Sequence, residues 1–392
     1  MKPLESITIL EFSTMITASL ASMMMAEQGA RVIKVEPMEI GDPMRYIGAR
    51  KADISALFAN CNRGKESLRI NLKSPEGVET IRSMIPSVDV VIHNFRPGVM
   101  DKLGLGSEAL RLINPQLIYA AISGFGTKGP LSNAPAYDPM IQAHAGVAAA
   151  QGRGDQPAFM RTLLCDKITG YTACQAVTSA LFMRERTRKG QHLDLSMIDS
   201  GLFFIFLDGF QNDTLLSEDH ERGPMLIDIL YDPWFCSDGS VIISLGSYDI
   251  QKRFLTAIDM QHLLKDPRFD TFQNQMRNIR ELKAAVAPRC ESLSCVDMVT
   301  RLRLADVPCA KVMTREEVLA QEQLEANGTV DIYDHPIAGR SRRVLAPPLF
   351  GGERLEPGAG APTHGQDTDS VLESFGLSAG AITKLRGDSI IG

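Results

Sequence analysis

The 392-residue sequence lacks the marks of a membrane, secreted or nucleic-acid-binding protein. No apolar stretch approaches the roughly 18 residues of a membrane span, and Glu5 stands where a signal peptide would need an apolar run. No block of lysines and arginines is present, and the formal net charge of −6 is spread along the chain. We therefore expect a cytoplasmic protein whose partners include neither nucleic acid nor a membrane.

Metal-binding and disulfide patterns are also missing. The seven cysteines contain no C-x-x-C pair and form an odd number, and the seven histidines show no metal-ligand spacing. This excludes a zinc site and a disulfide framework from the prediction. Cys165 follows two leucines, so it is interpreted as a packing residue, with a thiol nucleophile as the alternative.

Strand and helix signals alternate over the first 125 residues. The expected strands are 7–12, 31–36, 67–72, 89–93 and 117–123. The expected helices are 17–28, 75–84 with Ser74 as its cap, and 107–112. Short apolar strands joined by helices predict an α/β fold with a doubly wound, Rossmann-like and mainly parallel sheet.

The pattern changes after about residue 213. Residues 233–245 predict two strands around the Asp238-Gly239 turn, and helical segments follow as far as Leu304. Strands and helices return after Gly328. We predict a large domain made of residues 1–215 and 328–392, with a smaller α+β domain, residues 220–320, inserted between its two parts.

A dinucleotide-binding fingerprint, Gly124-Phe-Gly126-Thr-Lys-Gly129, follows one predicted strand. Pro130 and Pro135 prevent the helix on which a pyrophosphate would sit. An NAD-dependent dehydrogenase, which would fit the expected sheet, therefore lacks its glycine motif. The glycines predict a turn or an active-site loop instead.

Asp166 opens the long, largely apolar helix predicted for residues 166–186. The free N–H groups and positive dipole end of a helix would hold its carboxylate ionised, which suits a nucleophile. The alternative, from position alone, is a helix N-cap.

Several further segments, taken in order, resemble the pattern of one family. They are Ala30–Pro37 with Gly41 and Asp42, Asn62–Lys65, Asn71–Gly77, Asn94–Gly98, Leu103–Gly104, Gly124–Gly126, Ala136–Asp138, Arg161–Gly170 around Asp166, Thr187–Gln191, Val307–Pro308 and His364. No single segment is decisive, but their order and spacing are specific. On these residues, and over nearly its whole length, the chain resembles the class III CoA-transferases, also called the CaiB/BaiF family.

The resemblance implies an enzyme that moves CoA from an acyl-CoA to a free carboxylic acid. The family's aspartate attacks the thioester carbonyl, and the matching position is Asp166. The reaction would pass through an aspartyl mixed anhydride and an aspartyl-CoA thioester. These intermediates keep the acyl group activated, so no energy source or permanently bound cofactor is needed, but water must be excluded.

The resemblance also implies where coenzyme A binds. The adenosine end is expected near Ile70, Leu72, Lys73, Asn94, Phe95 and Lys102, and the pantetheine arm near Thr14 and Met15. Lys73 and Lys102 are expected to contact phosphates through their ammonium groups, and Arg96 through two N–H groups of its guanidinium. For each cation the alternative is a solvated surface charge.

Tyr137, Asp138 and Ile16 are expected near the acyl group. The alternative is an aromatic anchor at a helix start for Tyr137 and a helix N-cap for Asp138. The family's formyl-CoA branch has Gln where this chain has Ile16, and a glycine run that is missing here; residues 222–246 replace that region. Formate and oxalate are therefore not favoured as substrates. Arg45 or Arg161 is a candidate partner for the second carboxylate of a dicarboxylic acid.

The same family contains α-methylacyl-CoA racemases, whose His-Asp pair is replaced here by Tyr137-Asp138. A phenol with a pKa near 10 is a poor base, and the nearby His144 is expected to pack or hydrogen bond. Racemisation is thus an alternative, as is a non-catalytic CoA-binding protein. The resemblance further implies a homodimer in which two ring-shaped chains pass through each other.

Overall fold

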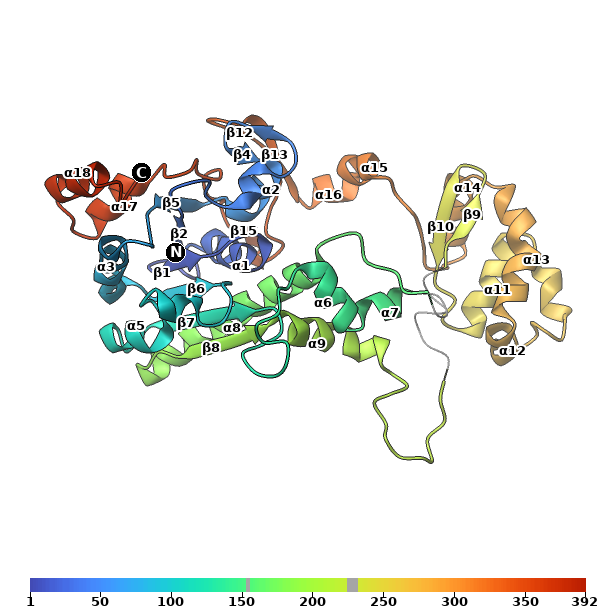
Figure 1. The fold of residues 1–392 in the computed structure, drawn as a ribbon. Helices are drawn as coiled ribbons and strands as arrows, with labels where there is room; N and C mark the ends of the chain where they lie inside the picture. The colour runs from blue at the N-terminus through green and yellow to red at the C-terminus, as the bar shows by residue number, and fades with distance from the viewer. Residues whose placement is uncertain (153–155, 224–231) are drawn as a thin grey trace. The chain divides into compact units, whose positions relative to one another are not determined.

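The computed structural model describes residues 1–152, 156–223 and 232–392. The chain forms two compact units (Figure 1). Unit 1 comprises Met1–Ile205 and Ala326–Gly392, and unit 2 comprises Phe206–Glu325. Among the described residues, no helix combines the length and the apolar character that a membrane span requires.

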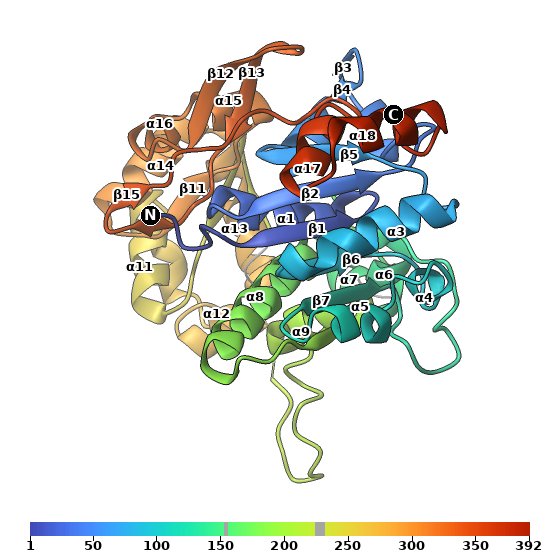
Figure 2. The ribbon, with the colours of Figure 1, turned by 90° about the vertical axis from the view of Figure 1, so that its left-hand side faces the viewer.

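Within the described residues, unit 1 is built on a six-stranded parallel sheet in the order β5-β2-β1-β6-β7-β8. The strands are β1 (Thr8–Phe12), β2 (Arg31–Glu36), β5 (Lys65–Arg69), β6 (Val90–His93), β7 (Ile118–Ser123) and β8 (His192–Ser196). Figure 2 shows them stepping across the unit from β5 to β7. The order reverses between β1 and β6, so the predicted doubly wound sheet is confirmed.

Helices cover both faces of this sheet. One face packs against α1 (Ile16–Glu27) and α8 (Leu164–Thr187). The other packs against α3 (Pro75–Met84), α5 (Ser107–Ile113), α17 (Thr368–Ser374) and α18 (Ala379–Gly387). Neighbouring strand residues point to opposite faces, so Ile9 joins the first core and Leu10 the second.

Shorter elements of unit 1 surround this framework. They are η1 (Pro43–Tyr46), β3 (Arg50–Lys51), β4 (Ile54–Ser55), α2 (Ala56–Asn62), η2 (Ile85–Ser87), α4 (Val99–Lys102), α6 (Asp138–His144), α7 (Val147–Gln151), β12 (Val330–His335), β13 (Gly339–Val344), β14 (Leu349–Phe350) and β15 (Glu353–Arg354). Three further helices lie at or next to the boundaries of the units: α9 (Met197–Gly209), α15 (Arg315–Ala320) and α16 (Glu322–Ala326).

Unit 2 has its own core of antiparallel strands and helices. The sheet order is β11-β10-β9, and Cys236 pairs with Gly239 across the predicted turn. The elements are β9 (Trp234–Cys236), β10 (Gly239–Ile243), α11 (Tyr248–Ala257), η3 (Gln261–Lys265), α12 (Phe272–Arg277), α13 (Ile279–Glu291), α14 (Cys295–Leu304) and β11 (Cys309–Lys311).

Candidate active site

The turn from β1 to α1 lies where the strand order reverses, the edge at which doubly wound sheets bind ligands. Two other segments of the chain hold it in place. The Asn94 side chain donates to the Thr14 carbonyl oxygen (2.7 Å) and accepts from the Thr14 N–H (3.1 Å). Met15 has a left-handed backbone, φ 62°, and its N–H donates to Asp42 Oδ1 (3.2 Å). The turn is therefore held rigidly although one residue is strained.

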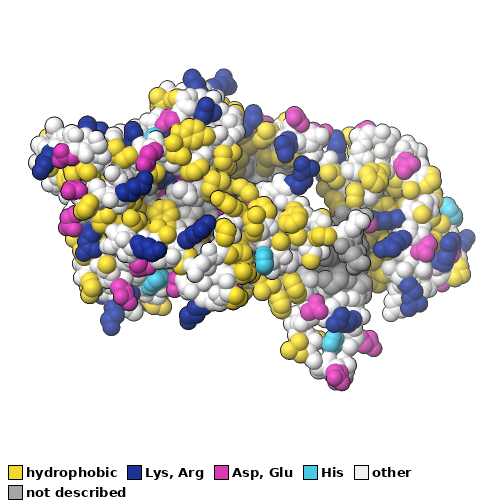
Figure 3. Space-filling view, viewed as in Figure 1, with side chains coloured by type: hydrophobic (Ala, Val, Ile, Leu, Met, Phe, Trp, Pro, Cys, Tyr) yellow, Lys and Arg dark blue, Asp and Glu magenta, His cyan; other side chains and the backbone are white. Residues whose placement is uncertain are grey.

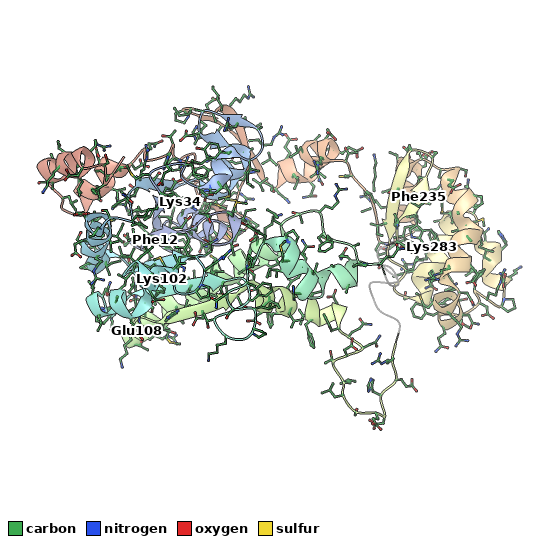
Figure 4. All side chains as sticks on the ribbon, viewed as in Figure 1. Phe12, Lys34, Lys102, Glu108, Phe235 and Lys283 are labelled. Atoms are coloured by element: carbon green, nitrogen blue, oxygen red, sulfur yellow. The ribbon has the colours of Figure 1, made fainter. Side chains whose placement is uncertain are left out.

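A buried cluster of charged side chains holds Asp42, which accepts from the Met15 N–H of this turn. Glu11 accepts from Lys34 Nζ and from Lys65 Nζ, each at 2.7 Å, and Lys34 Nζ lies 2.9 Å from Asp42 Oδ2. All four side chains are 0–5% exposed. Figure 4 places Lys34 and Phe12 among the sheet strands of unit 1.

The charges of this cluster compensate each other. Burial would raise the pKa of Glu11, but Lys34 and Lys65 lower it well below its usual range. Burial would lower the pKa of Lys34, but Asp42 and Glu11 raise it. Burial prevails at Lys65, whose pKa falls to about 8. The sequence carried a signal that our prediction missed: Glu11 and Lys34 are charged residues within apolar strands that helices cover on both faces.

Asp166 is the third residue of α8 and is 9% exposed. The helix begins at Leu164, and its N-cap, Leu163, makes no side-chain cap. The N-cap interpretation of Asp166 is therefore wrong. Its Oδ1 accepts from the Thr17 hydroxyl (2.5 Å), whereas Oδ2 accepts no hydrogen bond from any residue that the structure describes.

A second buried carboxylate, Asp138, lies beside Asp166. Asp138 Oδ1 accepts from the Asp166 N–H (3.1 Å), and Oδ2 accepts from Gln142 Nε2 (2.6 Å). Gln142 also binds backbone groups of Met160 and Thr162, so it ties the loop before α8 to α6. The N-cap alternative for Asp138 is wrong for its own helix, because Tyr137 holds that position.

The environment raises the pKa of Asp166 to about 6. Burial is the main cause, and the charge of Asp138 adds to it, whereas the Thr17 hydrogen bond and Lys167 oppose it. This corrects the expectation that the helix start would hold the carboxylate ionised more firmly than usual. Asp166 is still mostly ionised at pH 7 and is less well solvated than a surface aspartate.

The raised pKa predicts a stability difference. Ionising Asp166 opposes folding above pH 6, because its pKa is about 6 in the fold against an ordinary 3.8. Asp166→Asn should therefore raise the free energy of unfolding by about 2–3 kcal/mol at pH 7.5. The gain should shrink as the pH falls below 6, and it should vanish only below the ordinary pKa of 3.8, where both states hold the proton. Urea unfolding at fixed protomer concentration measures it, and a pH-independent difference would contradict this account.

Gly170, four residues after Asp166 in α8, explains how the Thr17 hydroxyl comes close to the Asp166 carboxylate. A Cβ atom at Gly170 would lie 2.9 Å from the Thr17 carbonyl oxygen and 3.2 Å from Leu20 Cδ2. Only glycine lets α8 approach the first turn of α1 this closely. Because Asp166 and Gly170 share one face of α8, the close approach brings the carboxylate to the Thr17 hydroxyl.

The positions expected to bind CoA follow three strands of the sheet at one edge. Thr14 and Met15 follow β1, Ile70 to Lys73 follow β5, and Asn94 to Arg96 follow β6. Ile70 is fully buried, whereas Leu72 and Phe95 are partly exposed beside the same core. Lys73 is exposed and pairs with Glu39 at 3.1 Å; Arg96 and Lys102 are exposed.

The structure shows the surroundings of three other residues for which a role was predicted, namely Arg45, Cys165 and His144. Arg45 is 0% exposed and binds both oxygens of Glu36 (2.9 and 2.6 Å), so it does not reach a substrate carboxylate. Cys165 is fully buried, and burial raises the pKa of its thiol to about 12, which favours packing over nucleophilic attack. His144 packs edge-on against Phe125 with ring centroids 5.2 Å apart.

Ile16 and Tyr137, both predicted near the acyl group, fall in contrasting surroundings. Ile16 is 3% exposed and packs in a core with Met44 and Phe58, and Tyr137 is 66% exposed. Their contact with substrate stays a prediction.

Comparison with known proteins identifies the family. The model of CoA-transferase family III matches residues 4–368. The acetyl-CoA:oxalate CoA-transferase of Acetobacter aceti is 32% identical over 86% of this chain and 88% of its own length. The succinate–glutarate CoA-transferase of Agrobacterium fabrum is 30% identical over 83% and 84%.

A solved structure shares the fold over most of the chain. The crystal structure of a CaiB/BaiF family protein from Brucella suis has a TM-score of 0.84 and 30% identity, covering 95% of this chain and 99% of that one. This chain belongs to CoA-transferase family III and is an enzyme that transfers CoA between acyl groups.

Proposed function

We propose that this enzyme moves CoA from an acyl-CoA to a free carboxylic acid with Asp166 as the covalent nucleophile. The observation that carries the proposal is the buried Asp166 carboxylate, which has one oxygen held by Thr17 and the other free of hydrogen bonds from the described residues. A carboxylate removed from water is a stronger nucleophile than a solvated one, and burial limits hydrolysis of its acyl adduct.

Four steps complete the reaction. Asp166 Oδ2 attacks the thioester carbonyl carbon, and the C–S electron pair leaves with CoA thiolate. The thiolate attacks Cγ of Asp166, breaks the bond from Cγ to Oδ2 and releases the first acid. The acceptor carboxylate attacks Cγ of the aspartyl-CoA thioester and releases the thiolate again. Attack of the thiolate on the acceptor acyl carbon then frees Asp166 as a carboxylate.

We assign CoA to the sheet edge that follows β1, β5 and β6. Thr14 and Met15 would contact the pantetheine arm, Ile70, Leu72, Asn94 and Phe95 would surround the adenosine, and Lys73, Arg96 and Lys102 would meet the phosphates. Tyr137, Asp138 and Ile16 would lie near the acyl group. The Lys73 pair with Glu39 is exposed, so it opens readily for a phosphate.

A label-transfer assay tests this function. The enzyme is incubated with an acyl-CoA and a ¹³C-labelled acid in heavy water, starting with oxalate, succinate and glutarate, the acids named for its relatives. We expect a labelled acyl-CoA and no matching exchange of the α-hydrogen of a 2-methylacyl-CoA. Rapid exchange of the α-hydrogen without an acceptor would instead establish a racemase. Binding of the acyl-CoA without either reaction would establish a non-catalytic CoA-binding protein.

We also propose the interlocked homodimer. Unit 2 is inserted between two parts of unit 1, so two chain connections join them, as a ring requires. Large apolar side chains of α8 and α9 are 54–77% exposed in the single chain, namely Tyr171, Phe182, Phe203 and Phe204. Figure 3 shows hydrophobic side chains at the surface over α6 as well. Such exposure marks surfaces that another chain covers.

The dimer predicts that folding and association are inseparable, because interlocked chains bury far more than the roughly 1,600 Å² of a standard interface. Light scattering at sub-micromolar concentration should still report twice the chain mass. A folded, active monomer on dilution would refute the arrangement.

A further inference from the structure

We propose that the Thr17 hydroxyl is a catalytic hydrogen-bond donor that stabilises the oxyanion formed at Asp166 each time its Cγ is attacked. The inference rests on the proposed function, and it assigns different tasks to the two oxygens of Asp166. Oδ2 forms and breaks bonds, whereas Oδ1 stays bound to Thr17 and takes up the negative charge.

The geometry separates the two oxygens. Thr17 is 3% exposed, and its hydroxyl has one proton, which it donates to Asp166 Oδ1. Among the described residues this is the only hydrogen bond of the Thr17 hydroxyl, so its proton is directed at Asp166.

The Thr17 hydrogen bond lowers the barrier of some steps of the reaction and not of others. When Oδ2 attacks the thioester, negative charge leaves Asp166, so the Thr17 hydrogen bond weakens and gives that step no help. When a thiolate or an acid attacks Cγ, the C=O bond to Oδ1 opens and a full negative charge develops there. The hydrogen bond strengthens in this transition state, which is the condition for catalysis by a donor.

The donor is also fixed before the reaction. Gly170 allows the close contact of α8 with the first turn of α1, and the turn before Thr17 is held by Asp42 through the Met15 N–H. Lys34 anchors Asp42 and Glu11 in turn. Because these groups are buried, little reorganisation is needed when the oxyanion forms.

A rapid-quench experiment on the whole enzyme tests this role. Thr17→Val, Thr17→Ala and Thr17→Ser variants are mixed with an acyl-CoA without acceptor, and the Asp166 peptide is followed by mass spectrometry as acyl adduct and as CoA adduct. In Thr17→Val and Thr17→Ala, the acyl adduct should form at close to the wild-type rate and accumulate. The CoA adduct should appear roughly 10²-fold more slowly. Thr17→Ser, which keeps the donor, should restore most of this rate.

Thr169→Val is the matched control. Thr169 is a fully buried threonine of α8 whose hydroxyl donates to the Cys165 carbonyl (2.7 Å) and not to Asp166. It should leave the ratio of the two adducts unchanged. The inference is overturned if Thr17→Val forms the CoA adduct at the wild-type rate, or if it slows both adducts equally. If the wild-type enzyme forms neither adduct on Asp166, the proposed function fails together with this inference.

Discussion

Asp166→Ala and Asp166→Asn should each lower kcat for CoA transfer by roughly 10⁴-fold or more, because both remove the nucleophile on which every covalent step depends. An amide keeps the size of the side chain and can still accept from Thr17, but it cannot form the anhydride. The fold should persist in both variants, since the carboxylate opposes folding at neutral pH. Steady-state transfer assays with the purified enzyme measure the loss.

Asp194→Asn provides the control for a general effect of charge. Asp194 lies in β8 with a side chain 56% exposed and makes no contact with Asp166 among the described residues. Its transfer rate should equal that of the wild type. If Asp166→Asn kept more than a tenth of wild-type turnover, Asp166 would not be the nucleophile.

Glu11→Ala should lower the free energy of unfolding by about 3–5 kcal/mol, the usual cost of leaving buried charges without their partner. The substitution removes the carboxylate shared by Lys34 and Lys65. Among the described residues, Lys34 keeps Asp42, but Lys65 keeps only the neutral acceptors Asn62 Oδ1 (2.7 Å) and the Ser19 carbonyl (2.8 Å). Urea unfolding at fixed protomer concentration measures the change.

A surface pair of unit 1 gives the comparison. Glu185 and Arg188 lie 3.4 Å apart with side chains 62% and 73% exposed, so Glu185→Ala should leave the unfolding midpoint almost unchanged. Equal midpoints for Glu11→Ala and the wild type would mean that the buried cluster does not stabilise the fold.

The sequence predicted the layout of unit 1 well where apolar patterns were uninterrupted. β2 and α3 occupy the residues expected, and Ser74 caps α3 by accepting from the Gly77 N–H (3.0 Å). The strand expected at 67–72 is instead β5, Lys65–Arg69. Lys65 was left outside the expected strand because a single sequence does not show that Glu11 neutralises it inside the core.

The candidate site was predicted only in part. Asp166 could be found because its motif is local, but Thr17 lies 149 residues away and meets it only through the contact of α1 with α8 at Gly170. Gln142 was missed for the same reason: the backbone groups of Met160 and Thr162 that it binds come from a different segment. The pKa of Asp166 was expected in the wrong direction because burial, which depends on packing, raises it more than the Thr17 hydrogen bond and the charge of Lys167 lower it.

The central claim, covalent catalysis through Asp166, is tested most directly by mass spectrometry of the enzyme quenched in acid after brief incubation with an acyl-CoA and no acceptor. We predict that the peptide containing Asp166 gains the mass of CoA less one water, as a thioester requires, and that hydroxylamine releases the CoA and converts Asp166 to a hydroxamate. An unmodified Asp166 peptide from an enzyme that turns over normally would contradict the account.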